Sequence, residues 1–345
     1  MTKKFTNIIQ AERIAKKLIR KGTFNWLVSG AEDGHTCNCN IEDLKKIKII
    51  PRILTKNKNL KLSSKIFNEE IKSPLILSPM GHQTQFNKLG EYATAAALNK
   101  IGHLGFFSTQ GRIRFSELRK RNPKAKLIYQ IFPFGNKDWI LKEIRQAEKY
   151  KSMALSFCFD APVRSHRYLD RESNYDARKY GIGEPISQDP SLALNYDWEF
   201  LRWIKSKTKL KIIPKGLISI DDIILSIKYA SDALWISNHG GRMFNSGISA
   251  TSVLINLRKK TKVKIPIIVD GGVRKGTDII KYMCLGANFV GIGRPAIYGL
   301  IIDGQKGVEK IFSILIQELK SAMLNGGFMS IKDMDFKRLN ISEKI

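Results

Sequence analysis

The chain has 345 residues, 43% of them hydrophobic, and a formal net charge of +28. This length allows one large barrel or two ordinary domains, and the apolar content excludes a disordered chain. The sequence has no apolar run near the roughly 20 residues that a membrane-spanning helix needs, and its first residues lack the apolar stretch of a secretory signal.

The positive charge favours anionic partners, but its lysines are scattered over nearly every predicted helix, with no arginine-rich stripe. This indicates a solvated surface and no nucleic-acid partner, with weak attraction to an acidic membrane such as the inner face of the cell membrane. Cys158 and Cys284 lie in apolar patterns typical of a core, and Cys37-x-Cys39 has no second pair at zinc-site spacing. We therefore expect reduced thiols, no bound metal and a cytoplasmic location.

Eight short apolar runs recur along the chain, with helical patterns between them. Each run is continuously hydrophobic rather than alternating, which indicates strands buried on both faces, as in a parallel sheet. Eight strand–helix repeats predict an α/β fold, a (β/α)8 TIM barrel. The runs are Pro74–Pro79, His103–Thr109, Leu127–Phe132, Met153–Asp160, Leu210–Gly216, Ala233–Asn238, Pro266–Asp270 and Phe289–Arg294.

The remaining segments are predicted to complete a single domain. Residues 1–73 are expected to form an N-terminal helical extension, with two helices and a small hairpin that closes the bottom or one flank of the barrel. The barrel covers residues 74–325, and a C-terminal tail covers 326–345. Residues 171–197 have no clear periodicity and are expected to form the longest loop, a candidate lid.

Charged side chains collect where these strands end. The sixth run is followed by Ser237-Asn-His-Gly-Gly-Arg242, the seventh by Asp270-Gly-Gly-Val-Arg274, and the eighth ends in Gly293-Arg294. The carboxyl ends of barrel strands meet at one mouth, so these groups are expected to share a site. Glycines admit a close backbone approach and guanidinium groups pair with phosphate oxygens, so the last two motifs predict a phosphate cradle. Ordinary tight turns are the alternative.

Five further side chains are expected to carry the chemistry. Lys215 ends the fifth run and is predicted to stabilise an anion formed in the reaction, with a snorkelling surface lysine as the alternative. His239 titrates near neutral pH, and a carboxylate such as Asp160 would fix its tautomer and raise its basicity. The alternative is a satisfied core histidine. Arg242 and Arg167 are predicted to clamp a substrate carboxylate.

At these residues the sequence resembles the FMN-dependent α-hydroxy-acid oxidase and dehydrogenase family, which includes glycolate oxidase and the lactate enzymes. The three strand-end motifs together carry the most specific part of the similarity. The resemblance implies a (β/α)8 barrel that binds FMN over its carboxyl-terminal mouth. It also covers Ser29–Asp33, Pro51–Leu54, Gly90–Thr94 and Asp160–Pro162.

The resemblance implies roles for the same five side chains. His239 would be the base, with Asp160 as its partner, and Lys215 would stabilise the reduced anionic flavin at its N1–O2 edge. Arg242 and Arg167 would hold the substrate carboxylate. A hydride equivalent would pass to the flavin N5.

The implied FMN contacts form two groups. Arg274 and Arg294 would hold the phosphate, whereas Ser108 and Gln130 would contact the isoalloxazine ring. The full set is Pro79, Met80, Gly81, Ser108, Gln130, Cys158, Lys215, Ser237, Asp270, Gly271, Gly272, Arg274, Gly293 and Arg294.

Four positions differ from the family pattern or vary within it. Trp26 and Phe132 stand where the family has substrate-contacting tyrosines, and each lost hydroxyl is worth roughly 1–3 kcal/mol if its partner is buried. The indole N–H of Trp26 is a donor that replaces one of them in part. We expect a different 2-hydroxy acid, a bulkier or more apolar one, or reduced activity. Gln110 replaces an often aromatic residue, and Gly81 is more typical of dehydrogenases, which disfavours oxygen as the acceptor.

The sequence therefore predicts oxidation of a small L-2-hydroxy acid to a 2-oxo acid, with electrons passing to a quinone, a carrier protein or oxygen. No fused haem domain is visible, and the family leads us to expect a homo-oligomer, a tetramer. The first alternative is another FMN-dependent barrel enzyme, such as an isoprenoid diphosphate isomerase, which has no use for the His239–Asp160 pair. The second is a catalytically weakened relative or a non-enzymatic binder, which retains the flavin structurally or holds nucleic acid on its basic surface.

Overall fold

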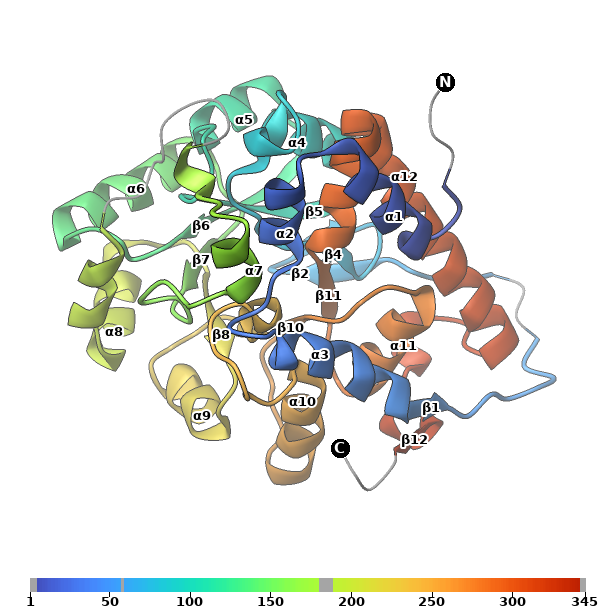
Figure 1. The fold of residues 1–345 in the computed structure, drawn as a ribbon. Helices are drawn as coiled ribbons and strands as arrows, with labels where there is room; N and C mark the ends of the chain where they lie inside the picture. The colour runs from blue at the N-terminus through green and yellow to red at the C-terminus, as the bar shows by residue number, and fades with distance from the viewer. Residues whose placement is uncertain (1–4, 57–58, 180–188, 342–345) are drawn as a thin grey trace.

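Eight parallel strands close into a barrel in the computed structural model, which describes residues 5–56, 59–179 and 189–341 (Figure 1). The order around the barrel is β10-β11-β4-β5-β6-β7-β8-β9, so each barrel strand lies beside its neighbours in the sequence. The predicted (β/α)8 barrel is confirmed. Its strands are β4 Leu75–Leu77, β5 Leu104–Ser108, β6 Lys126–Ile131, β7 Leu155–Cys158, β8 Ile212–Leu217, β9 Leu234–Ile236, β10 Ile267–Asp270 and β11 Phe289–Ile292.

Helices surround the barrel and follow its strands, as a parallel sheet requires. Side-chain caps fix several of their starts: Ser219 accepts hydrogen bonds from the backbone N–H groups of Asp221 and Asp222 at the start of α9. The last helix bends at Asp303 and Gly304, whose backbone angles are not helical. The helices are α4 Gly90–Ile101, α5 Phe115–Arg121, α6 Lys137–Lys149, α8 Trp198–Lys207, α9 Ile220–Lys228, α10 Ala250–Lys260, α11 Gly276–Cys284 and α12 Arg294–Gly326.

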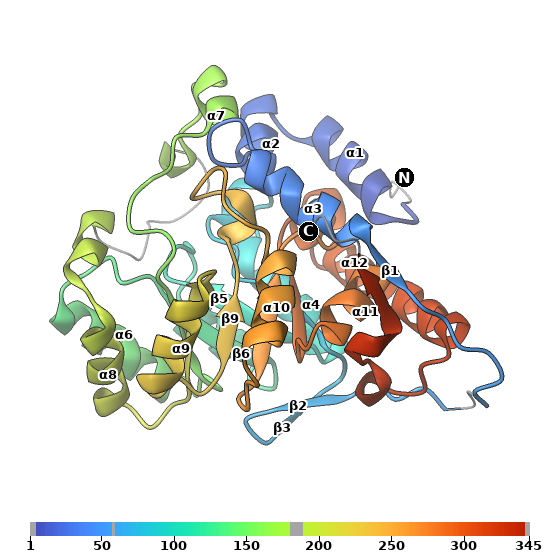
Figure 2. The same ribbon diagram turned by 90° about the horizontal axis from the view of Figure 1, so that it is seen from below.

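Large apolar side chains fill the amino-terminal end of the barrel. Phe106 and Trp235 meet edge to face there, with ring centroids 4.5 Å apart. Ile66 and Ile71 join the same buried cluster from outside the barrel, on the hairpin of β2 Ser64–Ile66 and β3 Glu69–Ile71. The predicted hairpin therefore closes the barrel bottom, and Figure 2 shows it at the opposite end from α2 and α7.

The N-terminal extension contains three helices rather than the two predicted. They are α1 Ile8–Leu18, α2 Lys21–Val28 and α3 His35–Lys46. The sequence signal was weak because α2 has eight residues and no side-chain cap. After α3, β1 Ile47–Ile49 pairs antiparallel with β12 Leu339–Ile341, which joins the N-terminal extension to the C-terminal segment.

The segment predicted as a long loop is partly ordered. Its first residues belong to α7 Tyr168–Glu172, and two 3-10 turns follow at Ala177–Lys179 and Pro190–Asn195. Residues 180–188 lie outside the described part, so the candidate lid stays a prediction. No helix within the described ranges is long and apolar enough to cross a membrane.

Candidate active site

A cavity of about 310 Å³ opens at the carboxyl ends of the barrel strands. The structure brings nearly all of the predicted site residues together in its lining. Three predicted residues lie just outside that lining and contact its members: Asp160 and Cys158 contact His239, and Ser237 contacts Lys215. The lining members are Trp26, Pro79, Met80, Gly81, Ser108, Gln130, Phe132, Arg167, Lys215, His239, Arg242, Asp270, Gly271, Gly272, Arg274, Gly293 and Arg294.

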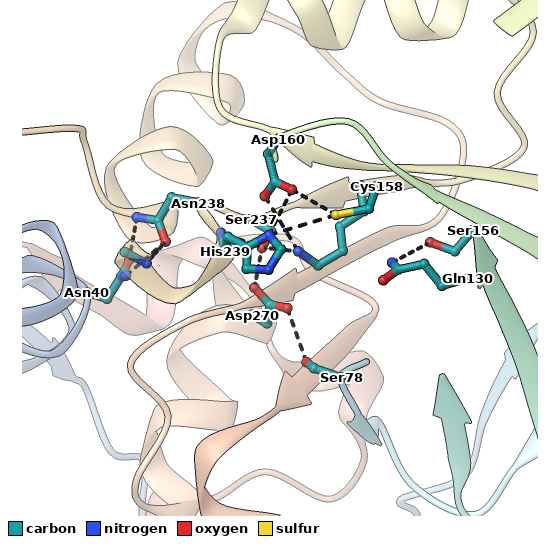
Figure 3. A network of polar contacts seen from close by, with 12 residues as sticks. Asn40, Ser78, Gln130, Ser156, Cys158, Asp160, Ser237, Asn238, His239 and Asp270 are labelled. Carbon is teal, nitrogen blue, oxygen red and sulfur yellow. Dashed lines mark hydrogen bonds and ion pairs between the residues drawn. The ribbon is translucent and has the colours of Figure 1, made fainter. Parts of the chain in front are cut away.

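His239 and Asp160 form a hydrogen-bonded pair at the mouth. The two residues follow β9 and β7, and His239 Nδ1 lies 2.9 Å from Asp160 Oδ1 (Figure 3). The backbone of His239 has a φ of 56°, an unusual conformation for a residue with a side chain. The Cys158 thiol donates to the same carboxylate oxygen. With Nδ1 engaged by the carboxylate, Nε2 is the ring nitrogen left to exchange a proton.

A buried chain of polar groups lies beneath this pair. Lys215 Nζ donates to Ser237 Oγ at 3.0 Å, and Ser237 Oγ donates to Asp270 at 2.6 Å. Ser78 donates to the other oxygen of Asp270 at 3.1 Å. Lys215 Nζ also lies 3.6 Å from Asp160, so its ammonium connects the carboxylates of two strand ends. Figure 3 shows Ser78, Ser237 and Asp270 pointing toward one another.

Burial and neighbouring charges set the protonation states here. Burial lowers the pKa of His239, and although Asp160 opposes this effect, the net shift is downward, so the imidazole is neutral at neutral pH. Burial would raise the pKa of Asp160, but Lys215 and His239 together hold it below its ordinary value. Burial would lower the pKa of Lys215, but Asp160 and Asp270 raise it. The site therefore presents a neutral base beside a fixed ammonium.

Two contacts hold the pair in place. Gly216 has a φ of 110°, and a Cβ on it would lie 2.4 Å from the Cβ of Asp160, so only glycine fits behind this carboxylate. On the other side, Asn238 exchanges amide hydrogen bonds of 2.9 and 3.0 Å with Asn40 of α3. The N-terminal extension therefore fixes the turn that carries His239.

The arginines at the cavity mouth differ in how many of their side-chain nitrogens are already bonded to the protein. Arg242 Nη1 donates to the carbonyls of Trp26, Leu27 and Ser29. These carbonyls lie at the C-terminal end of α2, where backbone carbonyls have no partner within the helix. Every hydrogen bond from Arg242 to the described residues uses Nη1, which leaves Nε and Nη2 for a ligand. Its guanidinium carbon lies 4.7 Å from the centre of the Trp26 ring.

Arg167 forms an ion pair of 3.0 Å with Asp170 of α7 and lies 5.7 Å from the centre of the same tryptophan ring. Trp26 thus lies within reach of both arginines of the predicted carboxylate clamp.

Arg294 and Arg274 differ as candidate phosphate ligands. Each of the three side-chain nitrogens of Arg294 donates to a carbonyl, on Leu27, Gly240 and Ser29. The side chain of Arg274 donates within the described residues only to the adjacent carbonyl of Val273, so most of its guanidinium donors remain for a ligand. Arg274 is therefore the better placed of the two to meet a phosphate.

Two titratable residues of the cavity lining, His82 and Arg164, were missed by the sequence reasoning. His82 lies in the loop after β4 and its ring meets Trp26 edge-on, with centroids 6.0 Å apart. Arg164 lies in the loop after β7, between Asp160 and Arg167. A signal was available for Arg164, because a third cation follows the strand-end aspartate by only four residues.

The residues present fit FMN. Arg274 lies between the end of β10 and the start of α11, and its guanidinium has donors left for a ligand. The start of a helix is a place where a phosphate is favoured. The buried Lys215 supplies a fixed positive charge for a flavin ring, and Ser108 and Gln130 line the same cavity. By contrast, the one described cluster with metal-ligand spacing, Cys158, Asp160 and His239, has the Lys215 ammonium beside it, which opposes a cation.

The fold and its mouth place this chain among barrel enzymes that hold a phosphorylated cofactor at the carboxyl ends of their strands. The sequence profile of FMN-dependent dehydrogenases matches residues 15–341, so the chain belongs to that family, whose cofactor is FMN. It is an oxidoreductase of the 2-hydroxy acid oxidase family.

Individual relatives agree over almost the full chain. A 2-hydroxyacid oxidase of Dictyostelium discoideum is 31% identical over 355 residues, which covers 96% of this chain and 89% of that protein. An L-lactate oxidase of Lentilactobacillus hilgardii is 31% identical over 350 residues, covering 97% and 94%. A solved mandelate oxidase matches with a TM-score of 0.91 at 24% identity, over 98% of this chain and 99% of that one, which supports the fold.

Proposed function

We propose that this chain oxidises an L-2-hydroxy acid to the 2-oxo acid, with His239 as the base. The observation that supports this most directly is the 2.9 Å contact between His239 and Asp160 at the mouth of a cavity that Arg242 and Arg167 also line. The relatives named above, a 2-hydroxyacid oxidase and an L-lactate oxidase, support the substrate class.

Each residue has a task in this proposal. Arg242 and Arg167 hold the substrate carboxylate, which removes much of the entropic cost of alignment. His239 accepts the substrate proton at Nε2, and Asp160 stabilises the imidazolium that results. Bound FMN supplies the acceptor for the hydride equivalent at N5. Lys215 then stabilises negative charge as it forms, because its ammonium is fixed in advance by Ser237.

Anaerobic mixing of the yellow holoprotein with candidate acids tests the proposal. We expect glycolate, L-lactate or a longer L-2-hydroxy acid to bleach the visible flavin absorbance, and D-lactate to have no effect. Failure of every L-2-hydroxy acid to bleach the flavin would overturn the proposal. That result would favour the isomerase or the weakened relative.

For the second half-reaction we propose an acceptor other than oxygen, a quinone or a carrier protein. The support is Gly81, which resembles the dehydrogenase members, and a Cβ there would lie 2.8 Å from the Cβ of Gln110. The two relatives compared above are oxidases, so this is where the chain would differ from them. Mixing the reduced protein with air-saturated buffer or with a soluble quinone tests it: faster reoxidation by oxygen would contradict the proposal.

A further inference from the structure

The cavity lining carries far more positive than negative charge. Among its described residues, one carboxylate, that of Asp270, faces six cations. Five of these cations have a place in the proposed reaction, at the cofactor or at the substrate carboxylate. Arg164 is the sixth and has no such place. The six are Arg164, Arg167, Lys215, Arg242, Arg274 and Arg294.

Arg164 is a cavity cation that protein groups neutralise only in part. Its guanidinium Nη2 lies 3.6 Å from Asp176 Oδ1, longer than a charge-assisted hydrogen bond. Its side chain is 52% exposed, so it can turn toward a ligand without breaking a buried contact. Arg164 lines the same cavity as His82 and as the two arginines proposed to hold the substrate carboxylate.

His82 adds a neutral polar group to the same part of the cavity. Burial lowers its pKa to about 4, and the nearby charges of Arg112 and Arg164 act in the same direction. The ring is therefore uncharged at neutral pH, and its buried Nδ1 has no hydrogen-bond partner among the described residues. A buried nitrogen without a partner is costly, and a polar ligand atom would satisfy it.

We propose that this outer part of the cavity, Arg164 with His82, binds a second carboxylate, so that the preferred substrates are 2-hydroxydicarboxylic acids. This inference rests on the proposed function and names its substrate class. The C1 carboxylate of the substrate binds to Arg242 and Arg167, and the distal carboxylate pairs with Arg164. A carboxylate suits the site better than a phosphate, because a single half-exposed guanidinium that already faces Asp176 neutralises one negative charge rather than two.

The substrate preference differs from the one expected from the lost hydroxyls. The replacements at Trp26 and Phe132 make the cavity more apolar near the clamp, and on that basis a bulkier or more apolar acid was expected. Arg164 changes this expectation, because an apolar side chain placed beside it would desolvate a charge without compensation. A side chain that ends in a carboxylate satisfies both the apolar walls and the terminal cation.

The test compares acids that differ mainly in the distal charge. The change in flavin absorbance measures the equilibrium binding of 2-oxoglutarate and of 2-oxopentanoate to the holoprotein. Anaerobic flavin reduction is then measured with L-malate, L-2-hydroxyglutarate and L-2-hydroxypentanoate. We expect the dicarboxylates to bind and react at least about tenfold better, the size of one charge-assisted hydrogen bond in a half-exposed site.

Arg164→Gln should reduce that preference about tenfold, and Arg164→Lys should retain part of it. Arg202→Gln is the matched control, because Arg202 is an exposed, ion-paired arginine outside the cavity, and it should leave the preference unchanged. Equal binding of the two oxo acids, or an unchanged preference in Arg164→Gln, would overturn the inference. Tighter binding of 2-oxoglutarate without flavin reduction by any acid would instead overturn the proposed function alone.

Discussion

The inner and outer walls of the cavity are built in different ways. On the inner wall, Lys215, Ser237 and Asp270 lie on barrel strands or directly after them, and each is buried and hydrogen-bonded to the next. On the outer wall, Trp26 comes from the N-terminal extension and Arg164 from a loop, and their contacts are looser ring and ion-pair contacts. The comparison suggests that the barrel fixes the chemistry, while the added segments select the substrate.

The largest expected effect comes from removing the base on the inner wall. His239→Gln should slow flavin reduction by about 10²- to 10⁴-fold, because a positioned general base contributes an acceleration of this size. Stopped-flow absorbance measures the rate, and the ratio of FMN to protein should be unchanged. His35→Gln, at an exposed position of α3, is the control. A variant at position 239 that keeps the full rate would show that His239 is not the base.

A smaller effect on flavin reduction is expected when the Asp160 side chain is displaced but not replaced. Gly216→Ala brings a Cβ against the Asp160 side chain, and we expect flavin reduction to fall by about 10²-fold, because small displacements of catalytic groups have effects of this size. Gly286→Ala is the matched control: its φ of 103° is close to the 110° of Gly216, but the nearest atom to its Cβ would be 3.7 Å away.

Both glycine variants should lose roughly 1–3 kcal/mol of stability through backbone strain. Only the variant at Gly216 should lose activity beyond what its stability explains. Equal losses of activity in the two variants would mean that the close packing behind Asp160 does not position it.

The difference between the inner and outer walls of the cavity also explains how much of the site the sequence could predict. The inner wall was predictable because consecutive strands end in His239, Asp270 and Gly293, and a barrel brings strand ends together whatever the loops do. The outer wall depends on contacts between segments far apart in the sequence. The Asn40–Asn238 pair and the arginines bound to the end of α2 are such contacts, and no local pattern predicts them.

Buried histidines at the two ends of the barrel should make stability depend on pH. Burial lowers the pKa of His82, at the mouth, to about 4, and that of His103, at the other end, also to about 4. In the unfolded chain each titrates near 6.5, so below that pH the unfolded state binds protons first and stability falls until about pH 4. At pH 5 each should cost about 2 kcal/mol.

Urea unfolding of the FMN-saturated protein at pH 7.5 and pH 5 measures this loss. His103→Met should reduce the difference between the two pH values by about 2 kcal/mol, and it should leave flavin reduction at pH 7.5 unchanged, since His103 lies outside the cavity. His82→Met should reduce the pH dependence equally. If both variants keep the full pH dependence, these rings are not held neutral by burial.

The smallest effect is expected from restoring one hydroxyl at Phe132, directly after β6. Phe132 lies 6.1 Å from the His239 ring, centroid to centroid, so a tyrosine there would place its hydroxyl next to the base. Phe132→Tyr should raise kcat/KM for small acids such as glycolate by up to about tenfold, the value of one hydrogen bond. Phe134→Tyr, in the neighbouring ring 5.1 Å away, is the control for added polarity without that position. If Phe132→Tyr leaves the small-acid rates unchanged, the missing hydroxyl does not limit activity. Substrate preference then depends on Arg164 and the other residues of the outer wall.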